Sequence, residues 1–372
     1  MIISRTPVRV SLFGGGTDYP IWFHENIGSV LSMAIDKYVY ISCRYLPPFF
    51  DYRSRIVYSK IELVNGPDDI EHPAVREGLK YLNVQDGVAI QHESDIPART
   101  GVGSSSSFAV GLLHALYTLR GHQPTKMRLA LDAIHLEQDL LHENVGVQDQ
   151  LAAAFGGFNR MNFYPDGTLE VLPVILPAAR LRELLDHLVL VFTGFQRNAS
   201  EIAARQIATT PSRTTELTAM RDLVDEAQRS LCSNEPIDRI GSLLDEAWHL
   251  KRSLSDSISN PTIDGLYEAA RDAGALGGKL LGAGGGGFAL LFVPPSRRKR
   301  VLERLSGLTY VPFRLDRGGS QIVHYLPEEY TNFEYPEPAV ALAGPGQHRN
   351  GHALRNGNGK KRESMAFAEA HR

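Results

Sequence analysis

The sequence predicts an α+β fold in two domains, and two observations support this prediction. The 372 residues, 43% of them hydrophobic, can bury more core than one average domain contains. Segments with strand patterns and segments with helix patterns follow one another without regular alternation, which favours separate α+β layers over a parallel, doubly wound sheet. A boundary near residues 173–186 is expected, which gives domains over 1–180 and 181–335.

Five segments are expected to form strands, because they are rich in β-branched and aromatic residues and are bounded by Gly, Pro or Asp. They are Val8–Phe13, Ser29–Ser42, Val88–Gln91, Leu188–Phe192 and Phe288–Val293. Six segments are expected to form helices, because apolar residues recur every three or four positions and helix breakers separate the segments. They are Ser107–Arg120, Lys126–Glu143, Ala199–Ile207, Leu217–Cys232, Ile237–Ser255 and Pro261–Ala273.

The last part of the chain, 336–372, differs in composition from the rest. It is dominated by Gly, Asn, Pro, His and basic residues. Such a segment buries too little apolar surface to offset the entropy of ordering it. We therefore expect 336–372 to be a disordered tail.

Charge and cysteine content exclude several classes of protein. A net charge of -3 and a pI near 6.5 give no reason to expect a nucleic-acid partner. Cys43 and Cys232 provide neither a disulfide framework nor a zinc cluster, so a reducing cytoplasm is expected. Residues 1–10 lack the apolar core of a secretion signal, and no apolar run reaches the roughly 20 residues of a membrane span. No membrane partner is expected, and a homodimer is left open.

A glycine- and serine-rich segment, Pro97–Ser107 (PARTGVGSSSS), runs directly into a helical pattern. Its backbone N–H groups can converge on an anion at a helix N-terminus, where the helix dipole also favours negative charge. A flexible turn with an N-cap serine explains this segment equally well when it is taken alone.

Two further glycine segments need a different interpretation. Gly282–Gly287 (GAGGGG) matches GxGxxG, but a helix precedes it and a strand follows it, the reverse of a Rossmann motif. Phe288 and Ala289 stand where a P-loop requires Lys and Ser or Thr, so a Walker site is excluded. Phe13–Tyr19 (FGGGTDY) is by itself only a tight turn after a strand.

Taken together, the segments RVSLFGGGTDY, PARTGVGSSSS and KLLGAGGGGF resemble the three signature motifs of the galactokinase, homoserine kinase, mevalonate kinase and phosphomevalonate kinase (GHMP) superfamily. The resemblance extends over roughly Ile2–Leu326 and includes a fourth block, Glu137–Gly157. It implies an N-terminal ribosomal-protein-like α/β domain, a C-terminal ferredoxin-like domain and ATP in the cleft between them.

The resemblance also implies roles for individual residues. Asp149 would be the catalytic base and Arg9 its cationic partner. Glu137 precedes Asp149 by twelve positions, which matches the superfamily's spacing between a magnesium-binding Glu and the catalytic Asp. Mg²⁺ would be held by Glu137 and Ser105. Contacts to ATP are expected from Pro97, Gly101, Gly103, Ser104, Ser105, Ser106, Gly284 and Gly285.

Simpler interpretations of these residues stay open. Ser104 and Ser106 are alternatives to Ser105 as the metal contact. Without the resemblance, Glu137 is a solvated residue on a helix face and Arg9 is a surface charge on a strand.

Within the superfamily, RVSLFGGGTDYP and VLSMAIDKYVYI resemble bacterial D-glycero-D-manno-heptose 7-phosphate kinases and, less closely, fucokinases. Galactokinases usually carry Glu-His in place of Gly15-Gly16, so galactose is not the expected substrate. The sugar would lie against Gly15, Gly16, Thr17 and Asp18. Contacts to its phosphate are expected from Arg197, Lys251 and Lys279, with Arg252 and Ser200 as further candidates, although each cation alone can be a solvated surface charge.

The expected reaction is transfer of a phosphoryl group from ATP to the anomeric hydroxyl of D-glycero-D-manno-heptose 7-phosphate. One alternative is a kinase for fucose or another free sugar. The other is a catalytically silent sensor of the same fold that binds a sugar and ATP.

Overall fold

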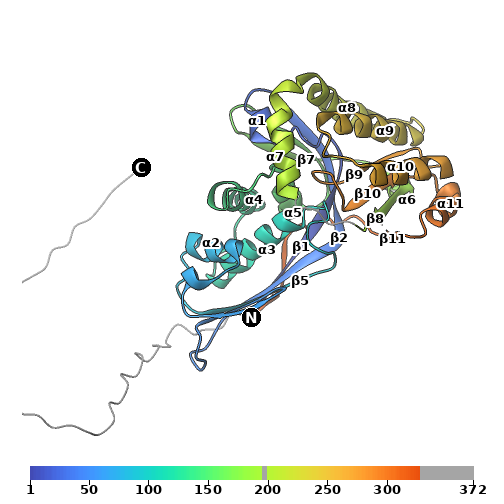
Figure 1. Ribbon diagram of the computed structural model, residues 1–372. Helices are drawn as coiled ribbons and strands as arrows, with labels where there is room; N and C mark the ends of the chain where they lie inside the picture. The colour runs from blue at the N-terminus through green and yellow to red at the C-terminus, as the bar shows by residue number, and fades with distance from the viewer. Residues whose placement is uncertain (195–198, 327–372) are drawn as a thin grey trace, which may run out of the picture. The chain divides into compact units, whose positions relative to one another are not determined.

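The computed structural model describes residues 1–194 and 199–326, whose strands form two sheets (Figure 1). The larger, eight-stranded sheet has the order β12–β1–β2–β5–β3–β4, with β6 paired to β2 and β7 to β6. Its strands are β1 (Ile2–Phe13), β2 (Gly28–Tyr45), β3 (Ser54–Val57), β4 (Ile61–Val64), β5 (Val88–Ser94), β6 (Phe158–Phe163), β7 (Leu169–Pro173) and β12 (Gln321–Tyr325). The smaller sheet has the order β11–β8–β10–β9, with β8 (Leu188–Phe192), β9 (Gly277–Leu280), β10 (Phe288–Phe292) and β11 (Thr309–Tyr310).

Helices pack on both sheets. They are α1 (Pro20–Phe23), α2 (Pro73–Tyr81), α3 (Ser104–Leu119), α4 (Lys126–His135), α5 (Gln148–Phe155), α6 (Ala178–His187), α7 (Ala199–Thr209), α8 (Thr214–Cys232), α9 (Asp238–Leu254), α10 (Pro261–Ala273) and α11 (Arg298–Arg304). Helix α3 packs on β1 and β2 with α4 and α5 beside it, whereas α8 and α9 pack on each other and α9 reaches β9 (Figure 1).

The long strand β2 joins the two halves of the larger sheet. Residues 28–33 pair with β6 and residues 39–45 pair with β5, while β1 runs antiparallel along the other side of β2. The register between β1 and β2 shifts at Pro7/Val8 and again between Ser11 and Phe13. Proline has no N–H to donate to the ladder, and bulges of this kind redirect side chains. The second shift lies where β1 enters the first glycine segment.

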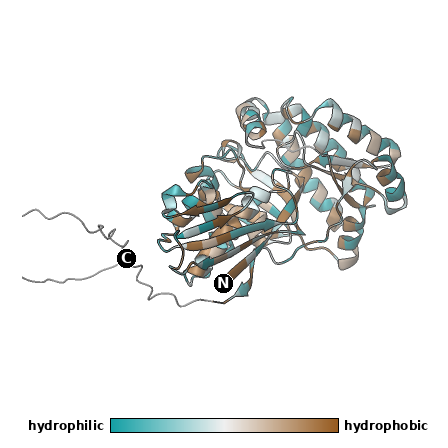
Figure 2. Cartoon of the chain, turned by 60° about the horizontal axis from the view of Figure 1, so that its bottom comes forward, coloured by the Kyte–Doolittle hydropathy of each residue, from teal (hydrophilic) through white to brown (hydrophobic). Residues whose placement is uncertain are grey.

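Helix α3 is largely buried. Its residues from Ser106 to Leu113 are all buried, so it has no solvated polar face of the kind that surface helices carry. Figure 2 shows hydrophobic residues recurring along the strands and helices of the chain. This burial holds the α3 N-terminus, and with it the serine-rich segment, in a fixed place.

The structure confirms the α+β class and contains every strand and helix expected within the described residues. The ends differ in places: β1 starts at Ile2, and α3 starts at Ser104. The helix expected over Lys126–Glu143 ends at His135 and continues as a π-helical turn, Leu136–Leu140. Helices α1, α2, α5, α6 and α11 have no counterpart among the sequence predictions.

The C-terminal strand returns to the larger sheet, where β12 pairs with the start of β1. The domain ranges 1–180 and 181–335 remain a prediction. The tail 336–372 and Arg197 lie outside the described residues. Within 1–194 and 199–326, none of the helices combines the length and apolar character that a membrane span requires.

Candidate active site

A pocket of about 440 Å³ is lined by residues of both sheets and of the loops between them. Most of the site residues predicted from the sequence line it, namely Arg9, Gly15, Gly16, Asp18, Gly101, Gly103, Ser104, Ser105, Ser106, Glu137, Asp149, Lys251 and Lys279. In the part of the chain that the structure describes, Pro97, Thr17, Gly284 and Gly285 do not line this pocket. Segments far apart in sequence therefore converge on one cavity.

The second and third glycine segments pack backbone against backbone. A Cβ added at Gly101, whose φ is +81°, would lie 2.6 Å from the carbonyl oxygen of Leu281. One added at Gly287 would lie 2.3 Å from the carbonyl oxygen of Thr100, which accepts a 3.0 Å hydrogen bond from the N–H of Phe288. Only glycine allows this approach. The third segment therefore supports the second.

Further contacts fix the conformation of the second and third glycine segments. Gly285 N–H donates to the carbonyl of Ile258 at 2.9 Å, and a Cβ on Gly284 would lie 2.8 Å from Ile258 Cα. The Thr100 hydroxyl donates to the carbonyl of Pro97 at 2.9 Å. Pro97, Gly284 and Gly285 are thus part of the loop framework.

The N-terminus of α3 opens onto the pocket. Gly103, with φ +75°, is the N-cap, and a Cβ there would lie 3.1 Å from Asp149 Oδ2 and 3.3 Å from Arg9 Cγ. Ser104, Ser105 and Ser106 form the first turn, where backbone N–H groups have no partner within the helix. These N–H groups and the helix dipole make this end suitable for an anion.

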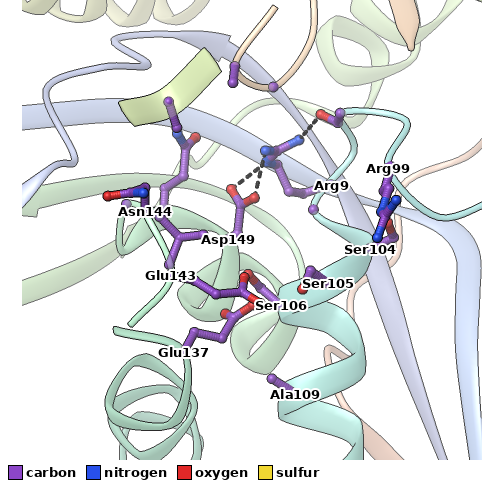
Figure 3. A pocket seen from close by; sticks show the side chains of 18 of the residues that line it. Arg9, Arg99, Ser104, Ser105, Ser106, Ala109, Glu137, Glu143, Asn144 and Asp149 are labelled. Carbon is purple, nitrogen blue, oxygen red and sulfur yellow. Dashed lines mark hydrogen bonds and ion pairs between the residues drawn. The ribbon is translucent and has the colours of Figure 1, made fainter. Parts of the chain in front are cut away.

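Arg9 and Asp149 form a two-pronged ion pair (Figure 3). Arg9 Nε donates to Asp149 Oδ1 and Arg9 Nη2 donates to Oδ2, both at 2.8 Å. The remaining Nη1 donates to the carbonyl of Gly101 at 2.7 Å. The Arg9 side chain is 4% exposed, whereas Asp149 is 23% exposed. Geometry of this kind fixes the orientation of the carboxylate while leaving it accessible to a substrate.

Asp18 is buried beside this pair. Its Oδ1 accepts from Gly16 N–H and its Oδ2 accepts from Gln148 Nε2, both at 2.9 Å. Burial raises the pKa of Asp18, an effect that these two hydrogen bonds oppose. A Cβ on Gly146 would lie 2.0 Å from Asp18 Oδ2, so only glycine fits at that position.

Thr17 braces the first glycine loop from inside. Its single hydroxyl proton is shared between the carbonyl oxygens of Gly14, at 2.9 Å, and Ser29, at 3.0 Å, and its oxygen accepts from the Ser29 N–H at 3.0 Å. The loop that carries Asp18 is thereby fixed to β2.

Glu137 lies in the π-helical turn that follows α4, buried next to Ser105 and Ser106 (Figure 3). Its Oε2 accepts from Gln150 Nε2 at 2.6 Å, while Oε1 has no hydrogen-bond partner among the described residues. Burial raises the pKa of Glu137 to about 7, an effect that the nearby Ser106 hydroxyl and the Gln150 amide oppose. Short π-helical turns of this kind are frequent at functional sites.

The unpartnered oxygen of Glu137 is suited to a cation. No group of three or more His, Cys, Asp or Glu side chains suited to a metal occurs within the described ranges. A metal here would therefore need other oxygen ligands, such as a serine hydroxyl, water and the phosphates of a ligand.

Two buried lysines line the same pocket. Lys251 of α9 donates from Nζ to the carbonyls of Leu280, at 3.2 Å, and Gly282, while Lys279 of β9 donates to the carbonyl of Leu12 at 3.2 Å. Burial lowers the pKa of Lys251 to about 8 and lowers that of Lys279 as well.

Other charges near the lysines act on the same pKa values. The positive charge of Arg9 lowers the pKa of both lysines, and the charge of Lys251 lowers that of Lys279 further. Asp18 and Asp149 oppose the shift at Lys251. Arg252, by contrast, pairs with Asp264 at 3.1 Å and lies outside the pocket lining within the described part of the chain.

One end of the pocket is defined by three aromatic side chains of its lining that pack together. Phe108 of α3 stacks on His72 with ring centroids 5.0 Å apart, and His92 meets Phe108 edge-on at 5.0 Å. Burial lowers the pKa of both histidines, so they are neutral near pH 7. This end suits a flat, uncharged group.

Sequence reasoning missed several residues of this pocket. Gln148 adjoins Asp149, and Ser11 follows Arg9 by two positions on a strand, so alternation along β1 was a usable signal. His72 and His92 come from separate segments and carried no local signal.

Family models match both halves of the chain: "GHMP kinases N terminal domain" matches residues 71–157 and "GHMP kinases C terminal" matches residues 225–310. A mevalonate kinase of Pyrococcus furiosus is 30% identical over 246 residues, which cover 63% of this chain and 69% of that protein. The chain belongs to the GHMP kinase family. Its fold is the two-domain GHMP kinase fold, and its class is that of the phosphotransferases with an alcohol group as acceptor.

Two further relatives bear on the branch of the family. The D-glycero-alpha-D-manno-heptose 7-phosphate kinase of Campylobacter jejuni is 28% identical over 315 residues, covering 82% of this chain and 93% of that protein. A crystal structure named as a D-glycero-D-manno-heptose 1-phosphate kinase from Bacteroides thetaiotaomicron superposes with a TM-score of 0.71 at 22% identity, covering 88% of this chain and all of that one. At this identity the second likeness concerns the fold alone.

Proposed function

We propose that this chain is an ATP-dependent sugar kinase that phosphorylates the anomeric hydroxyl of D-glycero-D-manno-heptose 7-phosphate and gives the 1,7-bisphosphate. The observation that supports this most strongly is one pocket in which the Arg9–Asp149 pair, the α3 N-terminus and the two buried lysines converge. The Campylobacter jejuni relative supports the choice of acceptor. We also keep the cytoplasm as the proposed location.

Asp149 is the proposed general base. Its carboxylate accepts the proton of the attacking hydroxyl, and Arg9 holds it in the orientation needed. In phosphoryl transfer the protein contributes mainly positioning and charge neutralisation, so a rigidly held base suits the reaction.

ATP and Mg²⁺ are the proposed cofactors. The nucleotide's phosphates would lie against Gly101, Gly103 and the serines of the first α3 turn, with its base towards His72 and Phe108. Glu137 and Ser105 would hold the metal, because the free Oε1 of Glu137 is a buried oxygen without a partner among the described residues. When bound, the metal neutralises charge on the phosphates.

The acceptor is proposed to lie at the opposite end. Gly15 is proposed to leave room for it, whereas at Gly16, proposed to lie beside it, a Cβ would lie 2.8 Å from Gln206 Nε2. Asp18 is proposed to accept hydrogen bonds from its ring hydroxyls. Lys251 and Lys279 are proposed to contact its phosphate, because buried ammonium groups gain most from a dianionic partner. Arg197 stays a candidate outside the described residues.

The test is an ADP-release assay on the purified chain with MgATP. D-glycero-D-manno-heptose 7-phosphate, D-mannose 6-phosphate, L-fucose and free heptose serve as acceptors. We expect the highest kcat/KM with the heptose 7-phosphate. A free sugar with an equal or higher kcat/KM would refute the proposed acceptor, and a lack of turnover with every acceptor would refute the sugar kinase itself.

A further inference from the structure

Two side chains bring unpartnered polar atoms to the wall of the pocket near Asp18. Ser11 is 4% exposed and Gln148 is 8% exposed, and both line the pocket. Within the described residues, Ser11 Oγ and Gln148 Oε1 make no hydrogen bond. Buried polar atoms of this kind cost free energy unless a ligand or water supplies the partner.

The chemistry of each atom is defined by its surroundings. Gln148 Nε2 donates to Asp18 Oδ2 at 2.9 Å, which orients the amide and leaves Oε1 as an acceptor. The Ser11 hydroxyl can both donate and accept. Hydroxyl groups have the hydrogen-bonding character that both atoms require.

Gly15 lies beside the Ser11 hydroxyl and the Gln148 amide group. A Cβ there would lie 3.6 Å from Ser11 Oγ and 3.8 Å from Gln148 Nε2, in ordinary contact with both. Gly14 and Gly16 have positive φ values, but Gly15 does not, so the backbone does not require glycine at this position. We therefore interpret the absence of a side chain at Gly15 as leaving space for a ligand beside Ser11 and Gln148.

We propose that Ser11 and Gln148 are specificity-determining residues that bind two hydroxyl groups of a polyol acceptor. Gln148 Oε1 accepts a hydrogen bond from one hydroxyl, and Ser11 Oγ donates to the oxygen of the other. The inference rests on the proposed function, because it adds residues to the same acceptor site. An acceptor without these hydroxyls leaves both atoms unpaired and is rejected.

The first test is Ser11→Ala, assayed with MgATP and the best acceptor of the four-compound panel. We expect kcat/KM for that acceptor to fall roughly 2- to 12-fold, the range of one neutral hydrogen bond, with the KM for ATP unchanged. Stability in urea should not fall, because no protein hydrogen bond is lost. Ser4→Ala is the matched control: this buried hydroxyl of the same strand donates to the Gly111 carbonyl at 2.8 Å. It should lower stability and leave both KM values unchanged.

Two further variants test the space beside Gly15 and the side-chain amide of Gln148. Gly15→Ala should fold normally and raise the acceptor KM alone, since its methyl group covers both residues without a clash in the free protein. Gln148→Met should also raise the acceptor KM alone, and by more than Ser11→Ala does, because it also removes a hydrogen bond to Asp18.

The outcomes separate this inference from the proposed function. If the wild-type protein turns over an acceptor and Ser11→Ala, Gly15→Ala and Gln148→Met keep its acceptor kcat/KM, the inference alone is wrong. The same holds if these variants change the KM for ATP as much as that for the acceptor. If the wild-type protein phosphorylates none of the four sugars, the proposed function fails and this inference fails with it.

Discussion

Asp149 and Glu137, two carboxylates that line the pocket, differ in whether the fold supplies a partner for their negative charge. Asp149 is held by two 2.8 Å hydrogen bonds from Arg9, so its charge is compensated within the chain. Glu137 receives a hydrogen bond from the Gln150 amide, and its Oε1 has no partner in the described ranges. A buried charge without a counter-ion marks the place where a ligand is needed, whereas a paired carboxylate is ready to act.

The buried lysines Lys251 and Lys279 allow the same comparison for positively charged side chains. Lys251 and Lys279 donate to backbone carbonyls, which supply only partial charges. Burial therefore lowers the pKa of Lys251 to about 8 and that of Lys279 as well. The Arg9–Asp149 region is complete without a ligand, and the Glu137 and lysine regions are completed by one.

The largest effect on activity is expected from a substitution in the Arg9–Asp149 ion pair. Asp149→Asn keeps the shape of the side chain but removes its basicity, so kcat should fall about 10²- to 10⁴-fold. Nucleotide affinity should stay nearly unchanged, because Asp149 serves the acceptor hydroxyl. Steady-state kinetics and titration of the variant with ATP measure the two quantities. Weaker ATP binding with normal turnover would contradict the role of base.

The next largest effect is expected at the lysines. Lys251→Met should lower kcat/KM for the phosphorylated acceptor about 10- to 150-fold, the range of a hydrogen bond to a charged group. Arg252→Ala is the matched control, because Arg252 is the next residue of α9 but pairs with Asp264. Its kinetics should match those of the wild type. An equal loss for free sugars and sugar phosphates would argue against a phosphate contact.

A smaller effect is expected at Glu137. Glu137→Gln removes the charge and keeps the size, so the Mg²⁺ concentration for half-maximal activity should rise at least about tenfold, the scale on which even outer partners of metal ligands act. Saturating Mg²⁺ should restore most of the rate. A magnesium titration identical to that of the wild type would exclude Glu137 as a ligand.

The sequence predicted the parts of this site that lie on local patterns. The α+β class and the α3 N-terminus follow from periodicity and from the run of Gly and Ser, and both are present in the structure. Glu137 and Asp149, which the resemblance to the superfamily related by their twelve-residue spacing, line one pocket, and their roles as metal ligand and base stay a prediction.

The rest depends on tertiary contacts that a single sequence does not encode visibly. Lys251 and Arg252 are adjacent residues that both carry a basic side chain. The packing of α9 against β9 buries Lys251, whereas Arg252 forms an ion pair with Asp264. Gly284 and Gly285 resembled phosphate-binding residues, yet their contacts are with Ile258. His72 and His92, which are distant in sequence, both pack on the ring of Phe108, and only the tertiary fold brings them there.

The smallest expected effect comes from pH and tests the lysine region without a mutation. The pKa of Lys251 in the fold, about 8, lies below its usual value, so the side chain is charged below pH 8 and neutral above it. Arg9 lowers the pKa of Lys251, Asp18 and Asp149 raise it, and the charge of Lys251 in turn lowers the pKa of Lys279. An acceptor phosphate is a dianion throughout, because its second pKa is near 6. Between pH 7.5 and 8.5 the protonated fraction falls about threefold, and the KM for the sugar phosphate should rise by the same factor. In Lys251→Met this rise should vanish, so an equally steep rise in the variant would assign it to another group.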